Sequence, residues 1–309
     1  MGRLWAHVDG TNSTVTYVSA RAHAPDLSRT STQDARGEDP VTQEKFYRVR
    51  DLSVIIPAHN EAARILTHLH SIHDALSRQA RSYEILVVDD GSQDDTVKVV
   101  RTFAKIEPAV RVIPLPTCMG KGGAVRHGML AARGRLQLFT DADGATAITE
   151  VDRLEQAIRN GADLAIGSRS LGSRQRGFTV NARWHRSILG GGFNALVRLG
   201  GIRGIGDTQC GFKLFERSVA RDLFSVSTIN GYGFDLELLF VAQQRGYRIA
   251  EVPVNWTDQP GSKVRLIRDG LAMLREFTII HRNAARGDYA PQAGPDPAAS
   301  LSAPSPITE

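Results

Sequence analysis

The sequence predicts an α/β fold in which a mostly parallel central sheet carries helices on both faces. Short apolar segments alternate along the chain with segments whose apolar residues recur at helical spacing. Apolar strands of this kind are typical of parallel sheets that are covered on both faces. Polar clusters directly follow several of these segments, and the ligands of open α/β sheets bind at the carboxyl ends of the strands.

The first half of the chain predicts strands and helices in turn. Segment 53–57 predicts the first strand, and Asn60 is a candidate N-cap for a helix whose apolar residues recur from Ile65 to Leu76. Four further strands are predicted at 84–88, 110–115, 136–140 and 163–167, with helices around 97–103 and 122–133. Beyond Ser168 the pattern is less regular, and it predicts helices near 187–199, 232–245 and 264–281 and a strand near 248–254.

One domain is predicted over residues 49–284, between two disordered segments. Residues 1–48 are polar and show no sustained period, and residues 285–309 are rich in Pro, Ala and Ser. Cys118 and Cys210 provide no disulfide framework, which suits a reducing cytosol. No window of 18 residues is continuously apolar, so we expect a cytoplasmic protein that contacts a membrane, if at all, peripherally on its inner face.

The chain carries a net charge of +5, and its basic residues are concentrated in one region. Between Gly167 and Lys213 there are eight Arg or Lys residues and one acidic residue, Asp207. Such a region suits the phosphates of a nucleotide, a lipid headgroup or a nucleic acid. Within it, an apolar helix around 184–197 that is flanked by arginines either lies on an anionic membrane or packs on the core.

Four polar clusters follow predicted strands and should meet at one edge of the sheet. They are Pro57–Glu61, Asp89–Thr96, Gly120–Ala124 and Asp141–Gly144. The two carboxylates of the last cluster suit a hard divalent cation, Mg²⁺ or Mn²⁺, and a lysine at a glycine-rich helix start suits phosphate. The spaced glycines of a dinucleotide-binding fold and of a Walker loop are both missing, which argues against these two nucleotide-binding classes.

These clusters resemble glycosyltransferase family 2, whose members have the GT-A fold. The resemblance rests first on Ser53–Glu61, Val87–Ser92 and Asp141–Gly144. Further segments resemble the dolichyl-phosphate β-glucosyltransferase and polyprenyl-phosphate glycosyltransferase branch of that family, and these segments are Gly120–Val125, Gly167–Arg169, Asp207–Lys213 and Val254–Trp256. The resemblance covers about residues 50–282 and implies a GT-A glycosyltransferase domain.

The resemblance also implies which residues bind the nucleotide sugar. Asp89 would contact uracil or ribose with the support of Asp90, Lys121 would lie beside the nucleotide, and Asp141 and Asp143 would hold the metal on the diphosphate. The full set that it implies for the nucleotide sugar is Pro57, Ala58, Glu61, Asp89, Asp90, Lys121, Asp141, Ala142 and Asp143.

On the acceptor side, the resemblance implies that Arg169 binds the acceptor or donor phosphate and takes part in catalysis. The other residues implied there are Asp207, Gln209 and Lys213. Asp235 and Glu237 match an acidic pair that faces the sugar in the family. Because residues two apart on a helix point to different faces, we expect only one of them to reach the site.

The predicted function is an inverting transfer of a hexose, glucose from UDP-glucose, to a polyprenyl or dolichyl phosphate. A phosphate monoester has a second pKa of about 6 and needs little help from a base, whereas a hydroxyl acceptor would need a carboxylate. The alternative enzyme uses GDP-mannose or a soluble or polysaccharide hydroxyl. A polyanion-binding protein on an inactive scaffold would not need Asp141 and Asp143 together, so no nucleic acid partner is expected.

Overall fold

The computed structural model describes residues 5–6, 15–18, 50–79, 81–181, 201–259 and 266–290. Its strands are β1 (Trp5–Ala6), β2 (Val15–Val18), β3 (Leu52–Ala58), β4 (Tyr83–Asp89), β5 (Val110–Pro114), β6 (Leu136–Thr140), β7 (Leu164–Ser168), β8 (Val180–Asn181), β9 (Phe212–Glu216), β10 (Ile249–Pro253) and β11 (Trp256–Thr257). Its helices are α1 (Ile65–Arg78), α2 (Thr96–Ile106), α3 (Lys121–Ala131), α4 (Val151–Arg159), α5 (Arg169–Gly172), α7 (Arg217–Val226), α8 (Phe234–Gln244) and α9 (Leu266–Arg286), with a 3-10 turn at Ile148–Glu150.

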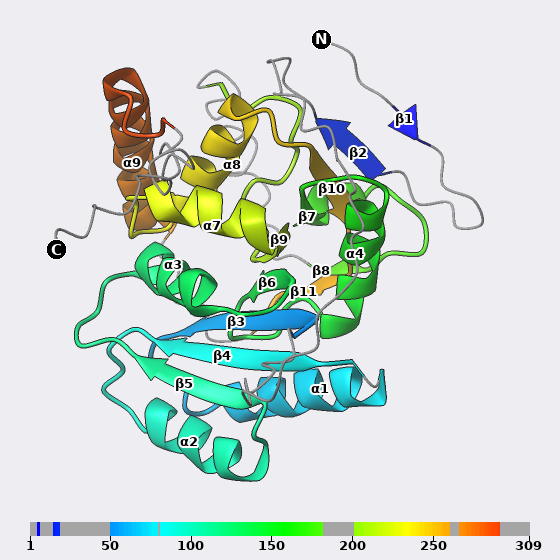
Figure 1. Cartoon of the computed structure of the whole chain (residues 1–309), viewed down its shortest axis with the longest axis vertical. Coiled ribbons are helices and arrows are strands. Elements are labelled where there is room, and N and C mark those ends of the chain that lie inside the picture. The colour runs from blue at the N-terminus through cyan, green and yellow to red at the C-terminus, as the bar shows by residue number, and fades with distance from the viewer. Residues whose placement is uncertain are drawn as a thin grey trace, which may run out of the picture.

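Nine of these strands form one sheet, in the order β1-β2-β10-β7-β9-β6-β3-β4-β5 (Figure 1). The neighbours β6-β3-β4-β5 are parallel, and so are β10 and β7. Strand β9 lies between β6 and β7 and is antiparallel to both. The prediction of a mostly parallel sheet is therefore confirmed, with β9 as an antiparallel strand at its centre.

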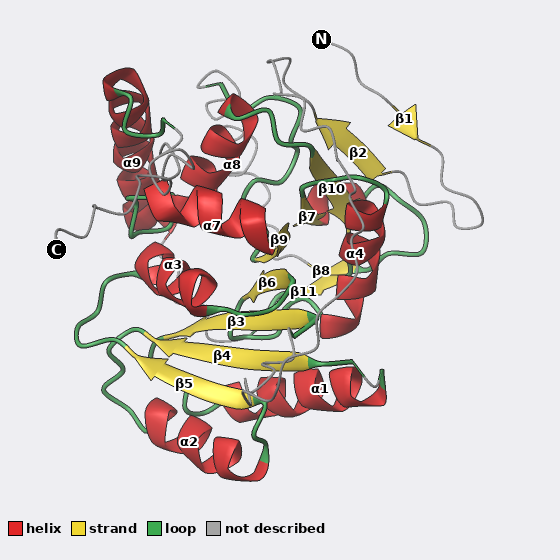
Figure 2. Cartoon of the chain, viewed as in Figure 1, coloured by secondary structure: helices red, strands yellow, loops and turns green. Residues whose placement is uncertain are grey.

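The sheet is buried on both faces, which explains why its strands are apolar throughout. In β3, Ile55 packs in the core under α3, α7, α8 and α9, while Val54 and Ile56 pack in the core under α1, α2 and α4. Figure 2 shows strands β3, β4 and β5 between α3 on one side and α1 and α2 on the other. Burying alternate side chains in two separate cores pins the register of each strand.

The two ends of the domain differ from the prediction. Val15–Val18, within the segment predicted to be disordered, is a strand that pairs antiparallel with β10. Its alternating Val-Thr-Tyr-Val sequence suits a strand, and it covers an edge that would otherwise leave backbone groups unpaired. At the other end α9 continues to Arg286, and the Tyr289 side chain is only 5% exposed. The predicted helix at 187–199, with its membrane contact, lies outside the described residues.

Asn60 does not cap the helix that follows it, because α1 begins only at Ile65. Asn60 instead adopts a positive φ of 53°, and its side-chain oxygen accepts hydrogen bonds from the backbone N–H groups of Gln93 (2.8 Å) and Asp94 (3.4 Å). Asparagine tolerates this left-handed conformation better than most residues. Asn60 therefore ties the loop after β3 to the loop after β4, at the edge where the polar clusters meet.

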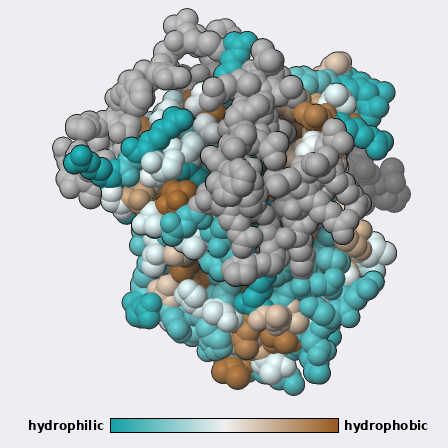
Figure 3. All heavy atoms as spheres, turned by 180° about the vertical axis from the view of Figure 1, so that it is seen from behind, coloured by the Kyte–Doolittle hydropathy of each residue, from teal (hydrophilic) through white to brown (hydrophobic). Residues whose placement is uncertain are grey.

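Few large apolar side chains are exposed among the described residues. On the face shown in Figure 3, hydrophobic residues form separate small areas among hydrophilic ones. Of the large apolar side chains in the described parts of the chain, Leu66, Ile106 and Leu130 are exposed. No helix within the described residues is both long enough and apolar enough to cross a membrane.

Candidate active site

The polar clusters meet at the carboxyl edge of β3, β4 and β6. Ala58 at the end of β3 pairs in register with Asp89 at the end of β4, and Asp141 directly follows β6 on the other side of β3. Ala58 and Asp89 are both buried, while Pro57 is half-buried. The structure thus brings the predicted nucleotide-binding residues of three strands together at one edge.

Lys121 lies over the carboxylate of Asp141. Its Nζ is 2.6 Å from Asp141 Oδ1 and lies 5.4 Å from the ring centre of Phe139 and 5.9 Å from that of Tyr232. Burial lowers the pKa of Lys121, but the charges of Asp141 and Asp235 more than offset this and leave the pKa raised. The lysine therefore stays an ammonium group, partly exposed at 25%, at the position where phosphate is expected.

Asp143 and Asp141 fit a hard divalent cation. Burial, together with the charge of Asp141, raises the pKa of Asp143, so a further cation would stabilise its ionised form. Asp143 Oδ1 accepts one hydrogen bond, from the backbone N–H of Ala145 at 3.0 Å. The ammonium of Lys121 shows that Asp141 already attracts a cation at this place. Carboxylate oxygens of this kind are ligands that Mg²⁺ and Mn²⁺ prefer.

Gly211 leaves the space that the Asp141 carboxylate occupies. A Cβ at position 211 would lie 2.0 Å from Asp141 Oδ2, and the Gly211 carbonyl accepts a hydrogen bond of 3.1 Å from the Asp141 N–H. The chain just before β9 therefore fixes both the backbone and the side chain of Asp141. Only glycine at position 211 allows this approach without displacing the carboxylate.

Gly211→Ala is expected to lower glycosyl transfer about a hundredfold, because a misplacement of about 1 Å at a reacting centre costs roughly that factor. The matched control is Gly270→Ala in α9, where an added Cβ meets nothing within 4 Å and should leave turnover unchanged. Turnover and thermal unfolding of both variants check this. A Gly211→Ala protein with turnover within threefold of wild type would contradict the assigned position of Asp141.

The side of the site next to β4 is built around Asp89 and Asp90. Asp90 accepts hydrogen bonds from the backbone N–H groups of Met119 (2.6 Å) and Gly120 (2.9 Å), which fixes the glycine turn that opens α3. Asp89 Oδ2 accepts one from the Ser92 N–H at 3.1 Å. Asp89 Oδ1 is buried and has no hydrogen-bond partner among the described residues. A buried acceptor of this kind suits an N–H or O–H group of a ligand.

The remaining residues predicted to border the nucleotide support this edge. The Glu61 carboxylate pairs with the Arg64 guanidinium, and the charges of Asp141 and Asp143 help to raise the Arg64 pKa. Ala142, between the two aspartates, is 8% exposed and packs in the core under α1. Glu61 therefore influences the Asp141 and Asp143 carboxylates through the charge of Arg64. No sequence motif had predicted a role for Arg64.

Arg169 and Asp207 form a bidentate pair on the other side of the site. Arg169 Nε lies 2.7 Å from Asp207 Oδ2, and its terminal nitrogen lies 2.8 Å from Oδ1. Burial alone would raise the pKa of Asp207, but Arg169 holds it below its usual value. The Arg169 side chain is 33% exposed, and its guanidinium carbon lies 5.5 Å from the ring centre of Trp256. Its pair with Asp207 thus holds a positive charge in a fixed position at this side of the site.

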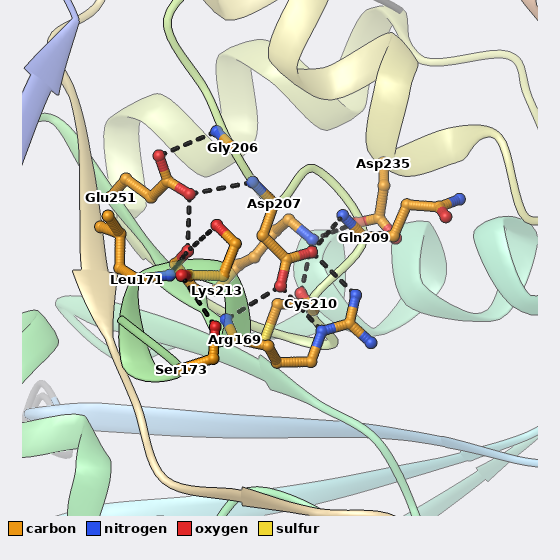
Figure 4. A network of polar contacts seen from close by, with 12 residues as sticks. Arg169, Leu171, Ser173, Gly206, Asp207, Gln209, Cys210, Lys213, Asp235 and Glu251 are labelled. Atoms are coloured by element: carbon orange, nitrogen blue, oxygen red, sulfur yellow. Dashed lines mark hydrogen bonds and ion pairs between the residues drawn. The ribbon is translucent and has the colours of Figure 1, made fainter. Parts of the chain in front are cut away.

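Glu251, in β10, supports the Arg169–Asp207 pair, as Figure 4 shows. Its carboxylate accepts hydrogen bonds from the N–H groups of Gly206 and Asp207 (both 2.9 Å) and from the Ser168 hydroxyl (2.6 Å). Sequence reasoning missed Glu251. The signal was present, because an acidic residue inside an apolar strand is almost never buried without a partner.

Asp235 faces the Lys121–Asp141 pair, and Lys213 holds it there. Lys213 is fully buried, with its Nζ 2.6 Å from both Asp235 Oδ1 and the Cys210 carbonyl oxygen. Burial raises the pKa of Asp235, whereas the positive charges of Lys213 and Lys121 lower it and leave a net increase. Lys213 has no exposed surface for an acceptor to touch, so it acts on the acceptor side only through its partners.

Glu237 points elsewhere, so its assignment to catalysis is corrected. It is fully buried and accepts hydrogen bonds from the N–H groups of Thr228 and Ile229 (both 2.9 Å) and from the Tyr289 hydroxyl (2.7 Å). These bonds join α8 to the loop before it and to the segment that follows α9. Of the two carboxylates, it is Asp235 that interacts with Lys121 and Asp141.

Gln209 and a group around Cys118 complete the site. Gln209 donates a backbone hydrogen bond to Asp207 (3.3 Å) and a side-chain one to Met273 Sδ (3.3 Å). His59, Asp90 and Cys118 offer ligand atoms within 4.8 Å of one another, on the side of Asp89 and Asp90 rather than beside Asp141. The two sides of the site are therefore a carboxylate edge on β3, β4 and β6 and a basic edge on β7, α5 and the segment before β9.

A mostly parallel sheet with two carboxylates directly after β6, and with the lysine that begins α3 beside them, is typical of glycosyltransferases that use nucleotide sugars. The model of the family described as glycosyl transferase family 2 matches residues 53–224. The chain belongs to glycosyl transferase family 2, and it is a glycosyltransferase.

Several curated proteins that are similar to this chain are named dolichyl-phosphate β-glucosyltransferase. The protein from Drosophila melanogaster is 42% identical over 243 residues, which cover 74% of each chain. The protein from Homo sapiens is 38% identical over 253 residues and 78% of each chain, and that from Saccharomyces cerevisiae is 36% identical over 257 residues. The similarity thus extends over more of the chain than the family model matches.

Two solved structures share the fold at lower identity. Mannosyl-3-phosphoglycerate synthase from Rubrobacter xylanophilus has a TM-score of 0.58 at 20% identity and covers 80% of this chain and 78% of its own. Glucosyl-3-phosphoglycerate synthase from Mycobacterium tuberculosis, solved with Mn²⁺, UDP and its product, has a TM-score of 0.54 at 23% identity and covers 75% and 78%. This likeness confirms the predicted GT-A fold.

Proposed function

We propose that this enzyme transfers glucose from UDP-glucose to a polyprenyl phosphate of the dolichyl type, with inversion at the anomeric carbon. The observation that carries the proposal is the 36–42% identity, over about three quarters of the chain, to proteins named dolichyl-phosphate β-glucosyltransferase. The geometry of the site supports it, because a carboxylate edge for a nucleotide diphosphate lies opposite a fixed guanidinium for a second phosphate.

Asp141 and Asp143 would hold the metal, Mg²⁺ or Mn²⁺, on the donor side. When bound, such a cation neutralises the charge that develops on the diphosphate leaving group. The buried Oδ1 of Asp89 accepts a hydrogen bond from the base or ribose, and Asp90 supports the turn before Lys121. The ammonium of Lys121 receives a phosphate oxygen beside them.

Arg169 orients the acceptor phosphate on the opposite side. An oxygen of that phosphate attacks the anomeric carbon and forms the new C–O bond, while the bond from this carbon to the diphosphate breaks and UDP leaves from the other face. The phosphate monoester is already ionised near neutral pH, since its second pKa is about 6, so no carboxylate has to remove a proton. This fits the position of Asp235, which is occupied by its pair with Lys213.

A lipid acceptor requires contact with a membrane surface. Arg174, Arg176 and Arg203 are exposed within the basic region between Gly167 and Lys213, and they suit anionic headgroups. The enzyme would then work as a peripheral protein, with its catalytic domain over residues 49–284 together with β2 and Tyr289, which pack onto it.

The test is a transfer assay with labelled UDP-glucose or GDP-mannose and either a short polyprenyl phosphate or a soluble sugar acceptor. Asp235→Asn is expected to keep turnover with the lipid phosphate within about tenfold of wild type. A general base contributes about 100- to 10,000-fold, so a hydroxyl-acceptor enzyme that used Asp235 would lose at least that much.

The matched control is Glu237→Gln, which removes one charge from the same helix, away from the site. It should lower the temperature of unfolding and leave turnover of the folded protein intact, because it weakens only buried hydrogen bonds. Label that enters a soluble acceptor but not the lipid, with a large loss in Asp235→Asn, would replace the proposed acceptor with a hydroxyl.

A further inference from the structure

We propose that Lys121 is the resident cation of the metal site. Without ligand, the ammonium group of Lys121 neutralises the Asp141 carboxylate. When donor and metal bind together, the Lys121 side chain moves so that its ammonium group leaves Asp141 and contacts the diphosphate. Lys121 would thereby make metal and nucleotide depend on one another for tight binding. This inference rests on the proposed function in one respect, the assignment of the metal to Asp141 and Asp143.

The ion pair occupies the carboxylate that the metal needs. Lys121 Nζ lies 2.6 Å from Asp141 Oδ1, which is the distance of a direct charge-assisted hydrogen bond. Asp141 is 33% exposed, so a cation from solution can reach it. A metal that arrives alone must therefore compete with an ammonium that is already in place.

The surroundings of Lys121 provide a second favourable position for its ammonium group. The rings of Phe139 and Tyr232 lie within 6 Å of Nζ, a distance at which an aromatic face attracts a cation. Asp235 also attracts the ammonium, and the buried Lys213 holds Asp235 in place. A lysine stem is flexible, so the charge can leave Asp141 without a movement of α3.

The charges of the cluster favour joint binding of metal and diphosphate. The carboxylates of Asp141, Asp143 and Asp235 face the ammonium groups of Lys121 and Lys213, which leaves one negative charge in excess when all of them are ionised. A divalent cation alone would reverse the sign of this excess. A diphosphate with two negative charges would add to it. The two together restore the original balance, so each lowers the electrostatic cost of binding the other.

The experiment measures Mn²⁺ binding to the whole protein by electron paramagnetic resonance, with and without UDP, and therefore uses no sugar and no lipid. Lys121→Met is expected to bind Mn²⁺ alone about tenfold more tightly than wild type, because the competing charge is gone. The enhancement of Mn²⁺ binding by UDP should shrink by a similar factor. Lys105→Met, which removes an exposed lysine on α2, is the matched control and should behave as wild type.

The outcomes separate this inference from the proposed function. Equal Mn²⁺ affinity of wild type and Lys121→Met without UDP would overturn the role of Lys121, while UDP-dependent Mn²⁺ binding in both would leave the metal assignment standing. Absence of Mn²⁺ binding to wild type even with UDP would overturn both. Asp141→Asn should abolish Mn²⁺ binding in every background, and binding that survives there would place the metal elsewhere.

Discussion

Replacing Asp141 with asparagine is expected to lower glycosyl transfer about a thousandfold while the protein stays folded. The change removes one charge and keeps the shape, so the close approach of Gly211 is preserved. It takes away a carboxylate from the metal and the partner from Lys121. Loss of charge stabilisation at a leaving group costs several kcal/mol, which corresponds to about this factor.

The measurement is the turnover number at saturating donor, with Mn²⁺ or Mg²⁺ varied. Asp143→Asn should give a similar loss, since its carboxylate shares the cation. Asp152→Asn on α4 is the matched control, an exposed aspartate whose change should leave turnover unaltered. Full metal-dependent activity in Asp141→Asn and Asp143→Asn would show that the metal is held by other residues.

Replacing Arg169 with methionine is expected to lower kcat/KM for the lipid phosphate about a hundredfold, with little change in KM for the nucleotide sugar. Methionine keeps much of the apolar stem and removes the fixed charge that faces the acceptor. Lysine should restore only part of the loss, because an ammonium cannot make the two parallel bonds that join Arg169 to Asp207.

Arg101→Met is the control, because Arg101 is exposed on α2, outside the basic region, and its loss tests the removal of a charge alone. Initial rates with each substrate varied in turn separate the two sides of the site. An Arg169→Met enzyme whose KM for the nucleotide sugar rises while its kcat/KM for the lipid is unchanged would move Arg169 to the donor side.

The donor edge was largely predictable from the sequence because parallel strands bring their carboxyl ends to one edge. Asp89 and Asp141 directly follow apolar strands, so knowing the strands was enough to place both side chains together. The acceptor edge depends on β9, whose antiparallel position no periodicity reveals. The sequence therefore suggested that Asp207 and Lys213 matter without showing that Lys213 is buried and that Asp207 is bound to Arg169.

Glu237 shows the limit of motif reasoning within a helix. Spacing alone establishes that Asp235 and Glu237 point to different faces, and only the packing of α8 decides which of them reaches the site. The partners of Glu237 are backbone groups of residues 228–229 and the hydroxyl of Tyr289, from a segment predicted to be disordered. Contacts between distant segments of the chain are the information that a local pattern lacks.

The place of β9 in the sheet has a consequence for the order of folding during synthesis. Strand β9 is hydrogen-bonded to both β6 and β7, although both of them precede it in the chain. When only the residues up to the end of β7 have left the ribosome, the edges of β6 and β7 that pair with β9 therefore still lack their partner. Pairings of this long-range kind form slowly. The Asp141 backbone bond to Gly211 must form at the same late stage, so the nascent chain completes its carboxylate edge only as its sheet closes.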